Sequence, residues 1–271
     1  MDMVRRLEAA EVLPNVDFIP AHAHLHPEFG SAMEQIAGGY AFYAGPGSPV
    51  NHGVGMGLNG PVTHEEFERF EAFYRVRNVP AEIVMSPYAD PSLREHTNSR
   101  GYKLTEFNSV LCQRLSADMR FPDPPAGVTI RRVEKENSRT WTDILVQGFA
   151  DLCPLSPELF EGFARLESSV PVFAYIDGNA VGGGNLSIFR QQRLAGLFGA
   201  ATLPEYRRRG VQTAMTYARL RMAADAGCDL AVVMTTPGSG SQRNAERQGF
   251  HVAYTKVVLV REWEGKMAGH P

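Results

Sequence analysis

An arginine-rich turn followed by a glycine is the part of this sequence best suited to bind an anion. The turn and the segment behind it read Arg207, Arg208, Arg209, Gly210, Val211, Gln212 and Thr213. At the start of a helix, such a turn presents free backbone N–H groups and the positive end of the helix dipole to a negative charge. The pattern therefore predicts a phosphate-binding loop.

The elements around this loop must be a strand before it and a helix after it. An apolar run from Leu194 to Leu203 is typical of a strand, and Gly227 stands where a helix C-cap is expected. Between them, apolar residues recur at the i, i+3, i+4, i+7 spacing of one helix face, at Val211, Ala214, Met215, Ala218 and Met222. The loop lacks both the Gly-Lys-Ser/Thr run of a nucleotide-binding phosphate loop and the spaced glycines of a dinucleotide fingerprint.

The stretch from Thr202 to Gln212 instead resembles the pyrophosphate-binding motif of the GNAT superfamily of acyl-CoA N-acyltransferases, Arg/Gln-x-x-Gly-x-Gly/Ala. Arg207 and Gly210 match this motif, whereas Gln212 departs from it but still supplies a backbone N–H. A second helix ending at Gly249-Phe250 follows at the distance usual in the superfamily. The resemblance implies acetyl-CoA as the acyl-donor substrate and no metal.

The resemblance also implies where the cofactor would lie. Its pantetheine arm would follow the end of the first strand, where small side chains allow a ligand to approach the backbone. Ser241 and Asn244 open the second helix and could bond the cofactor, although Ser241 equally fits a plain N-cap. The predicted cofactor-binding residues are Ala200, Ala201, Thr202, Arg207, Arg208, Arg209, Gly210, Val211, Gln212, Thr213, Ser241 and Asn244.

The sequence leaves the catalytic residues unknown. Transfer to an amine needs a base that removes a proton and an acid that protonates the departing thiolate. Many GNAT enzymes use a Tyr four residues before the Gly-Phe pair, and that position is Ala245 here. Tyr254 is a candidate acid that equally fits a core aromatic, while Asp151, Glu161 or a water chain are candidate bases.

Composition bounds the class of protein. The chain has 271 residues and a formal net charge of −3, which allows two domains and gives no reason to expect nucleic acid as a partner. No apolar run approaches the ~20 residues of a membrane span, and the first residues lack the apolar core of a secretory signal. We therefore expect a cytoplasmic protein with no membrane partner, of open oligomeric state.

Cysteine and histidine usage gives no metal or disulfide framework. Three widely spaced cysteines in apolar surroundings, at Cys112, Cys153 and Cys228, favour buried thiols. His22, His24 and His26 alternate as residues on one strand face would, which could serve a metal. Because no cysteine or acidic partner stands at a fixed spacing, a structural or surface role is favoured.

A proline-rich stretch at 121–127, with three prolines in four positions, predicts a linker between domains 1–120 and 128–271. The same order of helix, strand, helix and strand is expected on both sides. From Thr63 to Gly101 is 38 positions, as it is from Val211 to Gly249, which suggests a duplicated unit.

The first copy is expected to be degenerate. A shift of 148 positions puts Asn59-Gly60-Pro61-Val62 where the arginine loop stands, and Pro61 has no N–H to donate. The predicted fold class is α/β, an α+β mixed sheet in two tandem GNAT-like domains. Each domain would be a mixed, mostly antiparallel sheet flanked by helices, with only the second competent to bind acyl-CoA.

Three functions remain open at this point. The leading hypothesis is an acetyl-CoA-dependent N-acetyltransferase that transfers the acetyl group to the amine of a small molecule. The missing Tyr favours a second, a non-catalytic acyl-CoA-binding sensor or scaffold. A third, acetylation of a protein N-terminus or lysine, would call for an open acidic groove, and the sequence contains no such cluster of carboxylates.

Overall fold

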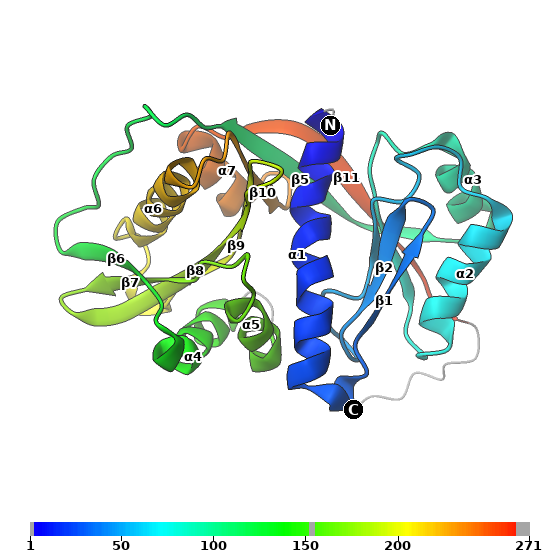
Figure 1. Cartoon of the computed structure of the whole chain (residues 1–271), viewed down its shortest axis with the longest axis horizontal. Coiled ribbons are helices and arrows are strands. Elements are labelled where there is room, and N and C mark those ends of the chain that lie inside the picture. Colours follow the sequence, from blue (N-terminus) through cyan, green and yellow to red (C-terminus); the bar gives the residue numbers. More distant parts are fainter. Residues whose placement is uncertain (1–2, 152–154, 264–271) are drawn as a thin grey trace. The chain divides into compact units, whose positions relative to one another are not determined.

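The computed structural model of the protein describes residues 3–151 and 155–263. They form two compact units (Figure 1). Unit 1 comprises the described residues up to Asn108 together with those from Tyr254 onward, and unit 2 runs from Ser109 to Ala253. Cys153 lies outside the described residues, whereas Cys112 and Cys228 are free thiols.

Unit 1 begins with a long helix and contains two shorter ones. Its elements are α1 (Met3–Leu25), β1 (Ala32–Ile36), β2 (Gly39–Tyr43), β3 (Gly53–Val54), α2 (His64–Arg75), β4 (Ala81–Met85) and α3 (Pro91–Ser99), with a 3-10 turn at Pro27–Phe29. The strand order is β1-β2-β3-β4-β11-β5, in which β5 (Lys103–Arg114) and β11 (His251–Arg261) contribute part of their lengths. Of the described pairs, only β3 with β4 runs parallel.

Local signals in unit 1 behave largely as the sequence predicts. Thr63 and Glu66 form the expected capping box at the start of α2. The face of α2 that carries Phe67, Phe70 and Tyr74 is buried in the core. The histidine run is the exception, because His22 and His24 lie on helix α1 and not on a strand. On a helix, His22 and His24 point to different sides because they are two positions apart.

Unit 2 is a mixed sheet with helices on both faces. Its elements are β6 (Val128–Arg132), α4 (Ser138–Phe149), α5 (Pro157–Ala164), β7 (Val172–Ile176), β8 (Asn179–Phe189), β9 (Leu194–Thr202), α6 (Val211–Asp225), β10 (Leu230–Thr235) and α7 (Gly240–Arg247), with 3-10 turns at Lys135–Asn137 and Pro204–Tyr206. The strand order is β5-β10-β9-β8-β7-β6. The pair β9 and β10 is parallel, and the other described pairs of the unit are antiparallel.

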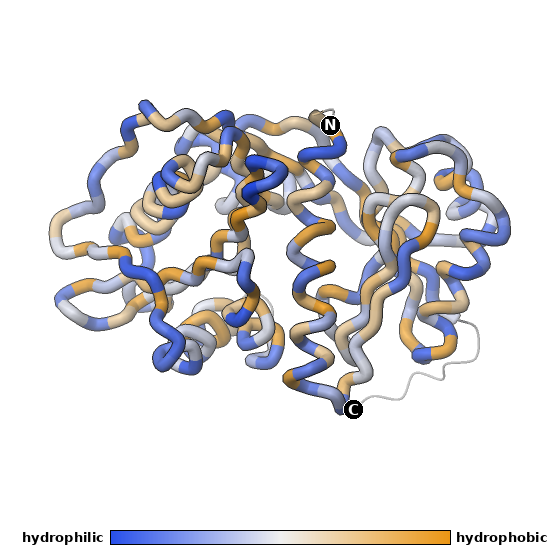
Figure 2. Tube along the Cα trace, in the orientation of Figure 1, coloured by the Kyte–Doolittle hydropathy of each residue, from blue (hydrophilic) through white to orange (hydrophobic). Residues whose placement is uncertain are grey.

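The alternation of side chains along these strands supplies two separate cores. Ala174 of β7 packs with Met215 of α6, whereas its neighbour Phe173 packs with Trp141 of α4 and Phe160 of α5. Helix α6 thus covers one face of the sheet, and α4 and α5 cover the other (Figure 1). Apolar residues are concentrated along the strands, and many outer turns are polar (Figure 2). The predicted mixed α/β fold class is confirmed.

Strands β5 and β11 each contribute residues to both units. In unit 2, residues 109–114 of β5 pair antiparallel with β10. In unit 1, residues 257–261 of β11 pair antiparallel with β4. The chain therefore passes between the units within two strands.

This division differs from the predicted boundary at 121–127. That stretch contains no helix or strand, as its prolines predict, but it lies inside unit 2. There the carbonyl of Phe121 accepts a hydrogen bond from Arg221 of α6. Prolines interrupt local structure without determining which unit the neighbouring strands pair with.

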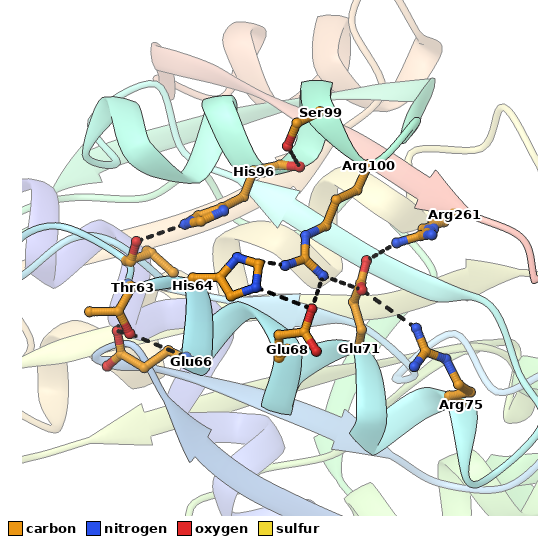
Figure 3. Close-up of polar contacts among 11 residues, drawn as sticks. Thr63, His64, Glu66, Glu68, Glu71, Arg75, His96, Ser99, Arg100 and Arg261 are labelled. Carbon is orange, nitrogen blue, oxygen red and sulfur yellow. Dashed lines mark hydrogen bonds and ion pairs between the residues drawn. The ribbon is translucent and has the colours of Figure 1, made fainter.

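The buried Glu71 carboxylate of unit 1 contacts Arg100 and Arg261, which come from other segments of the unit (Figure 3). The side chain of Glu71 on α2 is 1% exposed and accepts hydrogen bonds from Arg100 at 2.8 Å and from Arg261. Tyr102 donates its hydroxyl to the same carboxylate at 3.3 Å. Because these partners follow α3, end β11 and precede β5, one glutamate joins α2 to three other elements.

The strand exchange predicts that the two halves of the sequence are not independent folding units. A fragment of residues 1–120 lacks β11, which pairs with one edge of β4, and a fragment of residues 121–271 lacks β5, which pairs with one edge of β10. Each fragment alone should show no cooperative thermal transition by circular dichroism, whereas co-expression of the two should yield a folded complex. Cooperative unfolding of either fragment alone would contradict the exchange.

Removing the Glu71 carboxylate should destabilise the protein, because Arg261 loses this partner and Arg100, whose side chain is 13% exposed, keeps only the exposed Glu68 as a described ion-pair partner. We expect Glu71→Ala to lower the free energy of unfolding by ~3–5 kcal/mol in denaturant titrations. Glu68→Ala is the matched control, since Glu68 also contacts Arg100 but its side chain is 54% exposed. The control should lose less than ~1 kcal/mol. Equal losses would show that burial of Glu71 is not the source of the effect.

Candidate functional site

The only described parallel pair of unit 2 comes apart along its length. Strands β9 and β10 pair over three residues, Leu194 to Gly196 with Leu230 to Val232. Beyond Gly196, β9 remains paired with β8 but no described strand pairs with its other edge. The N–H and C=O groups along this edge are free to bond an extended ligand, as in recognition by strand addition.

A β-bulge lies where the two strands separate. The register of β8 and β9 shifts opposite Gly183 to Asn185, and Gly199 adopts a φ of +56°. The ring of Phe198 lies 5.2 Å from that of Phe163 on α5, and a Cβ on Gly199 would also point toward α5, 3.7 Å from Phe160. Two successive residues on one face bend the strand, which directs β9 away from β10.

The small residues after the bulge then face opposite sides of the sheet. Ala200 faces α6, since a Cβ on Gly184 would lie 3.1 Å from it and 3.4 Å from the guanidinium of Arg219. Ala201 packs against α4, where a Cβ on Gly148 would lie 2.6 Å away. Ala201 is buried and Ala200 is half-buried, so a ligand along the open edge would meet mainly the backbone of this segment.

The helix that follows β9 offers an uncapped N-terminus. Helix α6 begins after Gly210, and no described side chain caps it. Its first N–H groups, on Val211, Gln212 and Thr213, have no partner within a helix. By contrast, Ser239 caps α7, because its hydroxyl accepts a hydrogen bond from Gln242 N at 3.1 Å. The N-terminus of α6 is therefore the anion site that this geometry supports.

The N-terminus of α2 in unit 1 is already filled. The Glu66 carboxylate accepts a hydrogen bond from Thr63 N at 2.9 Å, and the Thr63 hydroxyl accepts one from Glu66 N at 3.2 Å. Hydrogen bonds from the backbone N–H and the hydroxyl of Thr63 lower the pKa of the Glu66 carboxyl, so a negative charge belonging to the chain itself lies at that helix end. An external anion would be repelled there.

The three arginines of the loop have different environments. Arg208 and Arg209 are exposed, and the Arg209 guanidinium lies 5.7 Å from the centre of the Tyr206 ring. Arg207 instead turns toward α4, where it forms an ion pair with Asp151. Hydrogen bonding to Arg207 lowers the pKa of the Asp151 carboxyl, which makes Asp151 a weaker base.

Two buried hydroxyls at the ends of the separated strands have no described partner. They belong to Thr202, the last residue of β9, and Thr235, the last residue of β10. Buried polar groups normally find a hydrogen-bond partner, so these hydroxyls are candidate ligand contacts. Thr202 was predicted from the sequence. Thr235 was missed, although its place at the end of the strand before the second helix was a usable signal.

The buried guanidinium of Arg219 lies close to Gly184, beside the bulge, and was not predicted from the sequence. Arg219 of α6 is 3% exposed and donates hydrogen bonds to the carbonyls of Asn185 and Met215. Burial lowers its pKa to about 10. The helical pattern gave no signal for it, because a sheet-facing position is usually apolar.

The second helix contributes less than predicted. Ser241 is exposed, and the N-cap of α7 is Ser239, so the N-cap alternative for Ser241 is wrong. Asn244 is exposed, and its side-chain oxygen accepts a hydrogen bond from Arg247. Ala245 is buried in an apolar cluster, so this position supplies no acid.

The three catalytic candidates have different environments, and they belong to different units. Tyr254 belongs to unit 1, where its hydroxyl donates to Glu8 at 2.6 Å, and Lys256 bonds the same carboxylate at 2.8 Å. Burial raises the pKa of Tyr254, which disfavours its ionised form. Asp151 is held by Arg207, and Glu161 lies half-buried on α5.

Neither a metal centre nor a membrane segment is found in the described part of the chain. No group of three or more His, Cys, Asp or Glu side chains within residues 3–151 and 155–263 could hold a metal ion. None of the helices in these ranges is both long enough and apolar enough to cross a bilayer.

Comparisons with known proteins place the separated strands β9 and β10 and the uncapped helix α6 within a segment that matches a known family. Residues 131–250 match the Acetyltransferase (GNAT) family, and this segment is a GNAT acetyltransferase domain. No curated protein matches the sequence.

Solved structures share the fold. A GCN5-related N-acetyltransferase from Kribbella flavida is 20% identical, with a TM-score of 0.64 over 91% of this chain and 95% of that one. One from Sphaerobacter thermophilus is 18% identical, with a TM-score of 0.60 over 82% and 72%. A tandem GNAT protein from the clavulanic acid biosynthesis pathway is 13% identical, with a TM-score of 0.62 over 86% and 83%.

The loop glycine predicts a stability effect with an internal control. Gly210 has a φ of +79°, and a Cβ there would lie 2.8 Å from Cγ of Pro125. Gly227, at the other end of α6, has a φ of +85° with nothing within 4 Å of such a Cβ. Gly227→Ala should cost ~1–2 kcal/mol of unfolding free energy through backbone strain alone. Gly210→Ala should cost more, and equal losses would mean that Pro125 moves aside freely.

Proposed function

We propose that unit 2 is an acetyl-CoA-dependent N-acetyltransferase that acts on the amine of a small molecule. The observation that carries this proposal is the open edge of β9, which ends at the uncapped N-terminus of α6. One site thus offers free backbone groups for an extended arm and free N–H groups for a phosphate. Acetyl-CoA has both parts, and GNAT acetyltransferases use it as their acyl donor.

The residues of the chain fit this donor. The backbone of Ala200, Ala201 and Thr202 would bond the pantetheine arm, and the N–H groups of Val211, Gln212 and Thr213 would bond the pyrophosphate. Arg208 and Arg209 add positive charge beside them. The donor supplies an activated thioester, while the chain positions it and lowers the energy of negative charge that develops on its carbonyl oxygen.

Unit 1 is, on this proposal, a copy without a donor site. Its α2 helix begins with a capping box whose Glu66 carboxylate occupies the position that a phosphate would need. Strand β3 precedes α2 as β9 precedes α6. Both residues of β3 pair in parallel with β4, so the edge of β3 that faces β4 is not open. The contribution of unit 1 would therefore lie in its strand and not in donor binding.

A second candidate function, a non-catalytic acyl-CoA sensor, is favoured by the environment of the candidate acids and bases. Ala245 is buried and apolar, Tyr254 is bonded to Glu8, and Asp151 is paired with Arg207. A sensor would bind the donor at the same site but would release no thiol with any amine.

Calorimetric titration with acetyl-CoA is the test. We expect one site per chain, and a double variant Arg208→Ala with Arg209→Ala should bind about tenfold more weakly, because each loop charge contributes modestly. Arg94→Ala, an exposed arginine of α3 in unit 1, is the control and should bind as the unmodified protein does.

A panel of small amines assayed for free thiol then separates the two functions. Thiol release that depends on an amine supports the acetyltransferase, and binding without release supports the sensor. Absence of acetyl-CoA binding would overturn both.

A further inference from the structure

Arg207, the arginine that matches the pyrophosphate motif, has its donors already engaged. Its Nε donates to Thr202 O at 3.1 Å, and Nη2 donates to Gly148 O at 3.0 Å. Nη1 and Nη2 also donate to the two carboxylate oxygens of Asp151, at 2.5 and 2.8 Å. One guanidinium thus joins the end of β9, the last turn of α4 and Asp151, two residues beyond that helix.

These contacts use the shape of the guanidinium and not only its charge. Two parallel bonds to one carboxylate, together with bonds to two carbonyls, require a planar fork of fixed donors. A lysine could keep the charge but could not reach all three partners. Arg207 and Asp151 are 34% and 52% exposed, so the pair should add little to global stability.

The position of the pair gives it another role. The last turn of α4 is in tight contact with β9, since a Cβ on Gly148 would lie 2.6 Å from Cβ of Ala201. The Nε bond to Thr202 closes the turn between the open edge of β9 and the loop that begins α6. The next residue, Arg208, has a strained φ of +63°, so the loop conformation needs such support.

We infer that Arg207 is a positioning residue and not a phosphate ligand, and that its pair with Asp151 holds the open edge of β9 and the N-terminus of α6 in one fixed relation. The arm and the phosphates of a single donor molecule can then bind together. This inference rests on the proposed function, because it concerns the same acetyl-CoA site.

A double-mutant cycle tests the inference. Affinities for acetyl-CoA are measured by calorimetry for the unmodified protein, Arg207→Ala, Asp151→Ala and the double variant. We expect each single variant to bind about tenfold more weakly and the double variant to be no weaker than either, because both changes remove one clamp. A phosphate ligand gives a different pattern, since Asp151→Ala would then leave binding unchanged or tighten it.

Two further variants separate position from charge. Arg207→Lys keeps the charge and loses the fork, so we expect it to bind as weakly as Arg207→Ala; Arg208→Ala removes a neighbouring charge without touching the clamp. Adenosine 3′-phosphate 5′-diphosphate, which keeps both phosphates of the pyrophosphate but lacks the pantetheine arm, should bind the two Arg207 variants within about twofold of the unmodified protein but should bind Arg208→Ala more weakly. Melting temperatures should change by less than about 3 °C, which excludes unfolding as the cause.

The binding results distinguish a failure of the positioning role of Arg207 from a failure of the proposed acetyltransferase function. If the unmodified protein does not bind acetyl-CoA, the proposed function fails and the inference fails with it. If it binds, and Arg207→Lys retains affinity while Asp151→Ala has no effect, the function stands and the positioning role is overturned.

Discussion

The separation of β9 from β10 is the constraint on which the rest of the site depends. Two neighbouring strands normally satisfy each other's backbone groups, but here the pairing stops after three residues. The bulge at Gly199 bends β9 without breaking its pairing with β8. The cost of unpaired backbone groups is thereby confined to one edge, and that edge leads directly to the start of α6. An extended ligand with an anionic end is the chemistry that would satisfy both.

The electrostatics of the loop follow from which charges are already partnered. Arg207 is engaged by Asp151, and Arg219 is buried against two carbonyls, so neither offers an exposed charge to an incoming anion. The exposed guanidinium groups are those of Arg208 and Arg209. The N-terminus of α6 adds its uncapped N–H groups. Recognition of an anion would therefore rest on backbone dipoles supported by two surface charges, while the motif arginine shapes the loop.

The exchange of β5 and β11 makes each unit depend on the whole chain. Strand β10, whose other edge opens the site, is held on its outer side by residues 109–114. Unit 1 is completed in the same way by residues 257–261. The first half of the sequence thus has a structural role in unit 2, because residues 109–114 pair with β10. Helices α2 and α6 differ at their N-termini, because a capping box fills that of α2 whereas no described side chain caps that of α6.

Sequence alone determined the features that are encoded over a few residues. These include the strand, loop and helix around Gly210, the capping box at Thr63, the interruption by prolines at 121–127 and the mixed α/β class, because periodicity, caps and breakers act locally. Only the tertiary structure decided that residues 109–114 pair with β10, that Arg207 turns to Asp151 across 56 positions, and that Arg219 is buried. Each of these depends on which distant segments pack together, and neither hydrophobic spacing nor a motif specifies the partner of a strand edge or of a long charged side chain.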